Sequence, residues 1–200
     1  MQPVLKFIAL LLVAMSFTLA SSKSHVRKHP SCQEFSQGVQ FKESEVYGTW
    51  HTLRFTSEDK NGSGNNCVEF TTVSDQERKI LAERLGKYVE NLKWETLTLK
   101  MKTPCDAIKT NSTYAQDYYL EKVGEDGSYR SFQVPPPNAK LDLAEIHRYP
   151  MRLKIIEEQY LGMMDCREKF VFLLSRHPIN MKDIDEKQKK LIDFYMPEEF

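Results

Sequence analysis

Short stretches in which polar and apolar residues alternate recur along most of the chain. Between residues 49 and 55 the alternation places Trp50 and Leu53 on opposite sides of an extended segment, as in a half-buried β-strand. Further strand signals, separated by turn-forming residues, occupy residues 67–73, 94–101, 118–123, 129–134, 153–160 and 170–174. Gly-Glu-Asp-Gly at residues 124–127 joins two of them and predicts a hairpin. Short strands with such spacers favour an antiparallel sandwich or barrel over alternating βαβ units.

Residues 76–92 interrupt this pattern, because Ile80, Leu81, Leu85 and Tyr88 fall near helical spacing. Gly86 weakens the prediction of a helix, since glycine is a poor helix former. Two strands joined by a charged turn would explain the same residues equally well. Both alternatives therefore stay open.

A second helical pattern occupies residues 183–195 near the C-terminus. Asp183 followed by Glu186 resembles the start of a capping box. The apolar residues behind it fall on one stripe of a helix, namely Ile184, Leu191, Ile192 and Tyr195. We expect one amphipathic helix that packs on the outside of the β structure.

The chain begins with an apolar stretch of a different kind. Lys6 precedes an apolar run over residues 7–14, and small residues follow at 20–22. This layout is typical of a cleaved signal peptide, and the run is too short for a comfortable membrane span. We expect residues 1–20 to be a signal peptide and residues 21–200 to form a single secreted, extracellular domain.

The charge balance argues against two classes of partner. Without residues 1–20 the chain keeps 27 basic and 28 acidic residues, whereas nucleic-acid-binding proteins carry a strong basic excess. The basic cluster at residues 23–29 lies just past the expected cleavage site, where we interpret it as a solvated tail. No later stretch approaches the roughly 20 apolar residues of a membrane helix. We expect no nucleic-acid partner and no membrane insertion.

Export also changes how the four cysteines are interpreted. In an oxidising compartment an even number predicts two disulfides, with three connectivities open. The cysteines concerned are Cys32, Cys67, Cys105 and Cys166. The same compartment makes Asn61 and Asn111 candidate glycosylation sites, because each begins an Asn-x-Ser/Thr sequon. Either sequon could also remain unused.

Catalytic, metal and cofactor sites have little support in the sequence. The cysteines contain no CxxC pair, and His25 and His29 lack a third ligand at a useful spacing. His51, His147 and His177 have no recognisable nucleophile near them, although His147 would be the nearest candidate for a haem ligand. We expect no enzymatic activity, no metal site and no cofactor.

Two separated motifs resemble those of the lipocalin family. Gly48 and Trp50 stand in YGTWHT on the first predicted strand, and Arg176 follows FVFLLS on the last. In that family the tryptophan closes the floor of an eight-stranded antiparallel up-and-down β-barrel, an arginine covers it, and a C-terminal helix packs outside. The family's middle Thr-Asp-Tyr-like triplet has no clean match, and residues 141–150 are the nearest region. This departure leaves the strand register between residues 110 and 165 open.

The barrel implied by this resemblance ranks the cysteine pairs. It brings Cys67, at the start of the second strand, near Cys105, at the end of the third. Cys32 would then pair with Cys166, similar to the way insect-type lipocalins anchor their N-terminal segment. The other two connectivities stay open at this point.

The resemblance also implies a function, that of a secreted carrier for a small hydrophobic ligand. Candidate pocket residues on the alternating strands are Phe70, Leu97, Leu99, Met101, Tyr118, Phe132 and Leu153. A slip of one residue in register would exchange lumen-facing and outward positions, so each could equally be ordinary core. The alternative is a secreted interaction module that contacts a cell-surface receptor or another protein. It would use the open-end loops at residues 58–66 and 134–140, with the cavity unused.

Overall fold

A computed structural model describes most of the chain after residue 30. It covers residues 31–37, 41–55, 67–105, 116–134, 146–179 and 183–195, with the backbone alone for Arg54, Phe55 and Tyr195. The expected signal peptide, both sequon asparagines, the loops at 58–66 and 135–140, His25 and His29 lie outside these residues.

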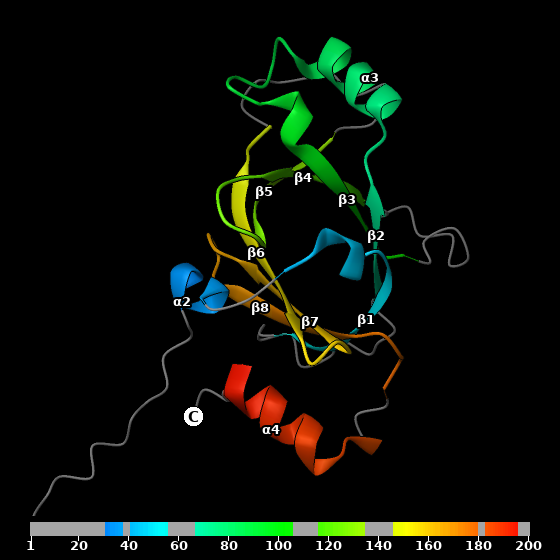
Figure 1. The fold of residues 1–200 in the computed structure, drawn as a ribbon, viewed down its shortest axis with the longest axis vertical. Helices are drawn as coiled ribbons and strands as arrows, with labels where there is room; N and C mark the ends of the chain where they lie inside the picture. The colour runs from blue at the N-terminus through cyan, green and yellow to red at the C-terminus, as the bar shows by residue number, and fades with distance from the viewer. Residues whose placement is uncertain are drawn as a thin grey trace, which may run out of the picture.

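Eight antiparallel strands form one closed barrel in which each strand pairs with its neighbours in sequence, and β1 pairs with β8 (Figure 1). The strands are β1 (Gly48–Phe55), β2 (Cys67–Thr72), β3 (Leu97–Thr103), β4 (Gln116–Lys122), β5 (Ser128–Gln133), β6 (Tyr149–Ile156), β7 (Tyr160–Asp165) and β8 (Phe170–Ser175). The predicted up-and-down barrel is therefore confirmed. Closure removes the exposed edges that an open sheet would present.

The prediction of one strand over residues 153–160 was wrong. This stretch contains the end of β6, a tight turn and the first residue of β7. Glu157 and Glu158 make the turn with φ of 51° and 62°, in a left-handed conformation that the sequence does not signal with glycine. β7 was missed because its first five residues are all buried, so that no polar alternation marks it.

The hairpin predicted at residues 124–127 is confirmed between β4 and β5. Gly124 and Gly127 both have positive φ, at 69° and 77°. A Cβ atom on Gly127 would lie 2.3 Å from the carbonyl oxygen of Leu153. Glycine is thus required at this position by both conformation and space.

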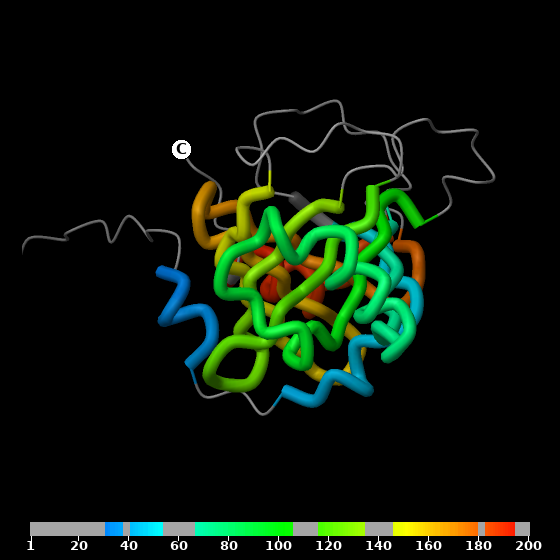
Figure 2. The backbone as a smooth tube through the Cα atoms, turned by 90° about the horizontal axis from the view of Figure 1, so that it is seen from above, coloured from blue at the N-terminus to red at the C-terminus, as the bar shows by residue number. Residues whose placement is uncertain are grey.

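Buried side chains form three clusters, one inside the barrel and two outside it. Trp50, Phe70 and Leu99 belong to the inner cluster, in the space that we call the lumen. One outer cluster lies between β3–β5 and the segment that contains α3 (Asp75–Leu85). The other lies between β6–β8 and two helices, α2 (Cys32–Ser36) and α4 (Glu186–Tyr195). Figures 1 and 2 show α3 and α4 on opposite sides of the barrel.

The structure decides between the two alternatives for residues 76–92 in favour of a helix. α3 begins after Ser74, whose side chain accepts a hydrogen bond from the Glu77 amide, and ends at Leu85, with Gly86 as the C-cap. Leu81 and Leu85 face the barrel, whereas Ile80 is 54% exposed. The helix is held to the outer face of the barrel by Glu77, which accepts a hydrogen bond from the Tyr119 hydroxyl at 2.6 Å.

The predicted C-terminal helix is confirmed as α4, with a later start than expected. Its capping box is formed by Asp185 and Gln188, each of which accepts a hydrogen bond from the other's backbone amide, rather than by Asp183 and Glu186. Ile192 is buried against the barrel. Ile184 and Leu191 are partly buried beside it, while the side chain of Tyr195 lies outside the described residues.

Both expected disulfides are present, and together they use all four cysteines. Cys67–Cys105 joins the start of β2 to the end of β3, and Cys32–Cys166 joins α2 to the turn after β7. Phe35 of α2 packs on the barrel so closely that a Cβ on Gly162 would lie 2.9 Å from its ring. The N-terminal segment is thus attached by a covalent bond and by packing.

Candidate functional site

Trp50 closes one end of the lumen, as the sequence motifs predict. It is fully buried, and its indole Nε1 donates a hydrogen bond of 2.7 Å to the carbonyl oxygen of Val46. The Arg176 guanidinium lies 3.7 Å from the indole ring centroid and donates hydrogen bonds to the carbonyl oxygens of Tyr47 and Glu45. Gly48 has φ of 97°, and a Cβ there would lie 3.5 Å from Arg176 Nη1. These residues seal the barrel. Of the three motif residues, only Trp50 has a side chain that borders the lumen.

The chain segment before β1 completes this floor. The 3-10 helix η1 (Glu43–Glu45) crosses the end of the barrel in Figure 1. One carboxylate oxygen of Glu43 accepts hydrogen bonds from the hydroxyls of Tyr129 and Thr98, each at 2.7 Å. Burial, and then the hydrogen bond to Glu43, raise the pKa of Tyr129 well above its ordinary value. Phe41 packs edge-on against the same tyrosine. This end of the lumen is filled by side chains.

Five of the seven predicted pocket residues lie together in the lumen. Phe70, Leu99, Met101 and Leu153 are buried in the inner cluster, and Tyr118 is partly buried against it. The other two, Leu97 and Phe132, lie instead in the outer cluster under α3.

Leu97 departs from the predicted alternation because β3 shifts register against β4. Leu97 pairs with Glu121, whereas Leu99, only two residues later, pairs with Leu120. The shift turns Leu97 to the outer face of the barrel. Phe132 is outward because it pairs with Tyr119, and its lumen-facing neighbour on β5 is Ser131. On β5 large apolar residues stand on both faces, Tyr129 toward the lumen and Phe132 toward α3, so the sequence pattern does not show which face is inner.

The lumen becomes more polar and more exposed toward the end opposite η1. Above the floor lie three buried methionines from three strands, Met101, Met151 and Met163. Beyond this methionine ring, strand alternation directs a mixed set of residues into the lumen. We call this set the mouth; its members are Gln116, Tyr118, Gln133, Tyr149, Asp165 and Phe170. Phe170 is 39% exposed although it is large and apolar.

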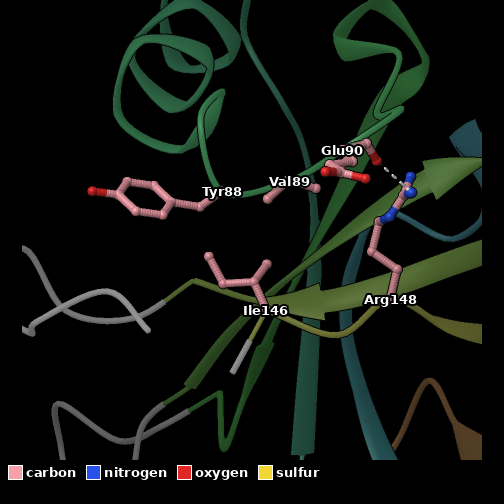
Figure 3. Close-up of a pocket in the computed structure, with 5 residues that line it drawn as sticks. All are labelled: Tyr88, Val89, Glu90, Ile146 and Arg148. Carbon is pink, nitrogen blue, oxygen red and sulfur yellow. Dashed lines mark hydrogen bonds between the residues drawn. The ribbon is translucent and has the colours of Figure 1, made fainter. Parts of the chain in front are cut away.

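A concave region lies outside the barrel, between the residues that precede β6 and the chain after α3. This depression of about 320 Å³ is lined by Tyr88, Val89, Glu90, Ile146 and Arg148 (Figure 3). Val89 and Ile146 form its apolar wall and belong to the buried outer cluster. The Arg148 guanidinium at its edge is bonded to protein atoms, so we interpret this region as a packing feature.

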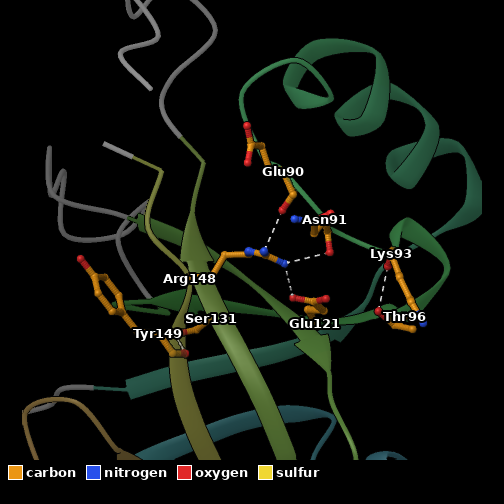
Figure 4. Close-up of polar contacts among 8 residues, drawn as sticks. All are labelled: Glu90, Asn91, Lys93, Thr96, Glu121, Ser131, Arg148 and Tyr149. Atoms are coloured by element: carbon orange, nitrogen blue, oxygen red, sulfur yellow. Dashed lines mark hydrogen bonds and ion pairs between the residues drawn. The ribbon is translucent and has the colours of Figure 1, made fainter. Parts of the chain in front are cut away.

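Arg148 connects the outer segment to the barrel wall. Its guanidinium lies 2.9 Å from the Glu121 carboxylate and donates hydrogen bonds to the carbonyl oxygens of Glu90 and Asn91 (Figure 4). Glu121 is buried on the outer face of β4, where an unpaired carboxylate would be costly. Arg148 therefore neutralises this charge and anchors the chain after α3.

Removing the Arg148 charge should destabilise the fold. We expect Arg148→Met to lower the free energy of unfolding by about 1–3 kcal/mol, because it leaves Glu121 buried without its partner. Lys122→Met, which breaks an ion pair with Asp126 at the surface, should cost less than about 1 kcal/mol. Urea denaturation of both variants measures the difference. Equal effects would contradict the role of Arg148 as an anchor.

The remaining site candidates are not brought together. Within the described part of the chain, no three histidine, cysteine or acidic side chains form a group that could hold a metal ion. His147 packs against the ring of Tyr149, with centroids 5.7 Å apart. His51 lies on β1, and His177 follows β8. No helix among the described residues is long and apolar enough to cross a bilayer.

Comparisons with known proteins leave the family open. The sequence matches no protein-family model, and no curated protein resembles it significantly.

Proposed function

We propose that this protein is a secreted carrier that holds a small hydrophobic molecule in the barrel lumen. The observation that carries this proposal is the gradient along the lumen. A sealed aromatic floor lies at one end, a ring of methionines follows, and the mouth is partly exposed. Methionine side chains are flexible and polarisable, so they adapt to the shape of an apolar ligand. A concave apolar site with a few polar groups at one side is typical of small-molecule binding.

The floor supports membership of the lipocalin family. The resemblance rests on Gly48, Trp50 and Arg176, which are far apart in the sequence. They meet at one end of an eight-stranded barrel, with the guanidinium over the indole. Such a contact contributes on the order of 0.5–2 kcal/mol and is stronger when partly desolvated. Three independent positions that converge on one contact support the family better than the short motifs alone.

Two observations support a place outside the cell. The N-terminal segment has the layout of a signal peptide. All four cysteines are joined in disulfides, which persist in oxidising compartments.

The energetics of a lumen site are favourable for a small ligand. Burying about 300 Å² of apolar ligand surface contributes roughly 7 kcal/mol before the cost of association. At the floor, the Tyr129 and Thr98 hydroxyls already donate to Glu43 Oε1, so neither donor is left for a ligand. Affinity would therefore come mainly from the apolar part of the ligand.

A substitution that fills the lumen tests this proposal. Ser131 is a small, buried residue that faces the lumen, and Arg130 beside it is exposed on the outer face. We expect Ser131→Trp to weaken binding of a neutral fluorescent apolar probe by about tenfold or more, because the indole occupies ligand space. Arg130→Trp places the same indole outside and should leave probe binding unchanged.

Fluorescence titration measures both affinities, and urea denaturation confirms that each variant is folded at the temperature used. Ser131→Leu provides a milder block should the tryptophan variant be unstable. Equal probe binding by all of these variants would contradict a lumen site.

A further inference from the structure

The charge of the mouth is carried by one side chain. On the lumen-facing positions between the methionine ring and the strand ends, Asp165 is the only carboxylate or cation among the side chains that the structure describes. It is placed there by the pairing of β6 with β7, in which Asp165 lies opposite Met151 of the methionine ring. The neighbouring lumen positions carry uncharged groups. A ligand group at the mouth would therefore meet this one negative charge, whereas the Glu43 carboxylate lies at the floor.

Asp165 is held rigidly by the turn that follows β7. Its Oδ1 atom accepts hydrogen bonds from the backbone amides of Arg167 and Glu168, at 2.9 and 3.0 Å. No described residue donates a hydrogen bond to its Oδ2 atom. The carboxylate is thus preorganised through one oxygen while the other keeps its capacity to accept a hydrogen bond.

A second acceptor lies on the other side of the lumen. The Tyr118 hydroxyl donates its proton to Gln116 Oε1 at 2.5 Å, which leaves the phenolic oxygen as an acceptor. Burial, and then the negative charge of Asp165, raise the pKa of Tyr118. The tyrosine therefore remains neutral at physiological pH, and it lies within the electrostatic reach of Asp165 although the two come from β4 and β7.

Aromatic rings and the charges outside them complete the environment. Tyr118 and Phe172 pack against the inner cluster, and aromatic rings of this kind attract cations. The Arg167 guanidinium lies 4.5 Å from the Tyr149 ring centroid. Its charge is balanced by Glu168 at 3.2 Å. Among the ion pairs of the described residues, Arg167 pairs with Glu168 and not with Asp165.

We propose that the lumen selects hydrophobic amines, with the apolar body among the methionines and the protonated amino group at Asp165 and Tyr118. This inference rests on the proposed carrier function and specifies the class of ligand. An ammonium group supplies the hydrogen-bond donors that the two acceptors lack. A carboxylate on the same apolar body would face Asp165 with no lumen-facing cation among the described mouth residues to offset the repulsion. The protein should accordingly prefer an amine to a fatty acid of equal length.

Three ligands with the same alkyl chain test the preference. Decylamine, decanol and decanoate are used to displace a neutral fluorescent apolar probe at pH 7, where the amine is protonated and the acid is ionised. We expect decylamine to bind about tenfold or more tightly than decanol, as for a hydrogen bond to a charged group. We expect decanoate to bind more weakly than decanol.

Asp165→Asn removes the charge and keeps the Oδ1 acceptor that the turn requires. This variant should lose the preference for decylamine over decanol while binding decanol as before. Asp193→Asn is the matched control, because Asp193 is exposed on α4 outside the barrel. It should leave all three affinities unchanged.

The outcomes separate this inference from the carrier function. If decanol binds but the amine shows no advantage, or Asp165→Asn keeps the advantage, the amine preference is wrong and the carrier function stands. If neither the probe nor any of the three ligands binds, both are wrong.

Discussion

Replacing Trp50 by alanine should lower the free energy of unfolding by about 3–5 kcal/mol, the cost typical of removing a large buried aromatic side chain. The indole is 0% exposed. It contacts lumen residues on one side and Arg176 on the other. The change also leaves the carbonyl oxygen of Val46 without the indole donor that it now accepts from at 2.7 Å. Both losses occur at the floor, where η1 meets the first and last strands.

Chemical denaturation measures this effect against two further variants. Trp50→Phe keeps part of the buried ring and should cost less than Trp50→Ala. Ile80→Ala removes apolar atoms from a side chain that is 54% exposed on α3, so it should change stability by no more than about 0.5 kcal/mol. An unchanged denaturation midpoint for Trp50→Ala would contradict the role of Trp50 as the stabilising residue of the barrel floor.

Removing the disulfide between Cys32 and Cys166 should cost more than removing the other one. The first joins residues 134 apart in the sequence, and the second joins residues 38 apart. Because a longer loop loses more entropy when it is closed in the unfolded chain, the loop-entropy relation predicts about 5 kcal/mol for the first and about 4 kcal/mol for the second.

The two Cys→Ala double variants allow this comparison under identical conditions. Unfolding in guanidinium chloride measures the stability of each variant. In a separate experiment, limited proteolysis of the folded variants reports whether α2 leaves the barrel. We expect α2 to become sensitive only when Cys32 and Cys166 are replaced, because Phe35 alone must then hold it against Gly162. A larger loss for the Cys67–Cys105 variant would show that local packing, rather than chain entropy, dominates.

The sequence predicts strands well where one face is buried and the other is polar. β1, β2, β4 and β5 largely follow this rule and lie close to their predicted ranges. β8 was predicted from a continuous apolar run instead, because both of its faces are buried. β7 was missed, because α2 and α4 cover its outer face while the lumen buries its inner face, and the turn before it carries no glycine. A strand buried on both sides carries no alternation to detect. The preceding turn uses Glu157 and Glu158 at positive φ, where glycine or asparagine would have marked it.

The sequence predicts a lumen-facing residue correctly where the alternation along its strand is not interrupted. Phe70, Met101 and Leu153 face the lumen as expected. Leu97 does not, because a single register shift reverses its direction, and such shifts depend on pairing between strands. Asp165 could not be identified from the sequence for a related reason. It stands at the end of a strand that was not predicted, so nothing indicated that it faces the lumen.

The contact between Arg176 and Trp50, in contrast, could be predicted from the sequence. These residues are far apart in the chain, and their meeting follows from closure, since the first and last strands of an up-and-down barrel must be neighbours. A long-range contact of this kind is predictable when the topology is known, even though the register of the intervening strands is not.

Native mass spectrometry of the protein secreted by cells that express the full chain tests the central claim most directly. We predict a mature chain without its first residues, both disulfides intact, and one small hydrophobic molecule that dissociates at higher collision energy. An empty protein that also fails to bind neutral apolar probes and alkylamines would contradict a carrier function for the lumen.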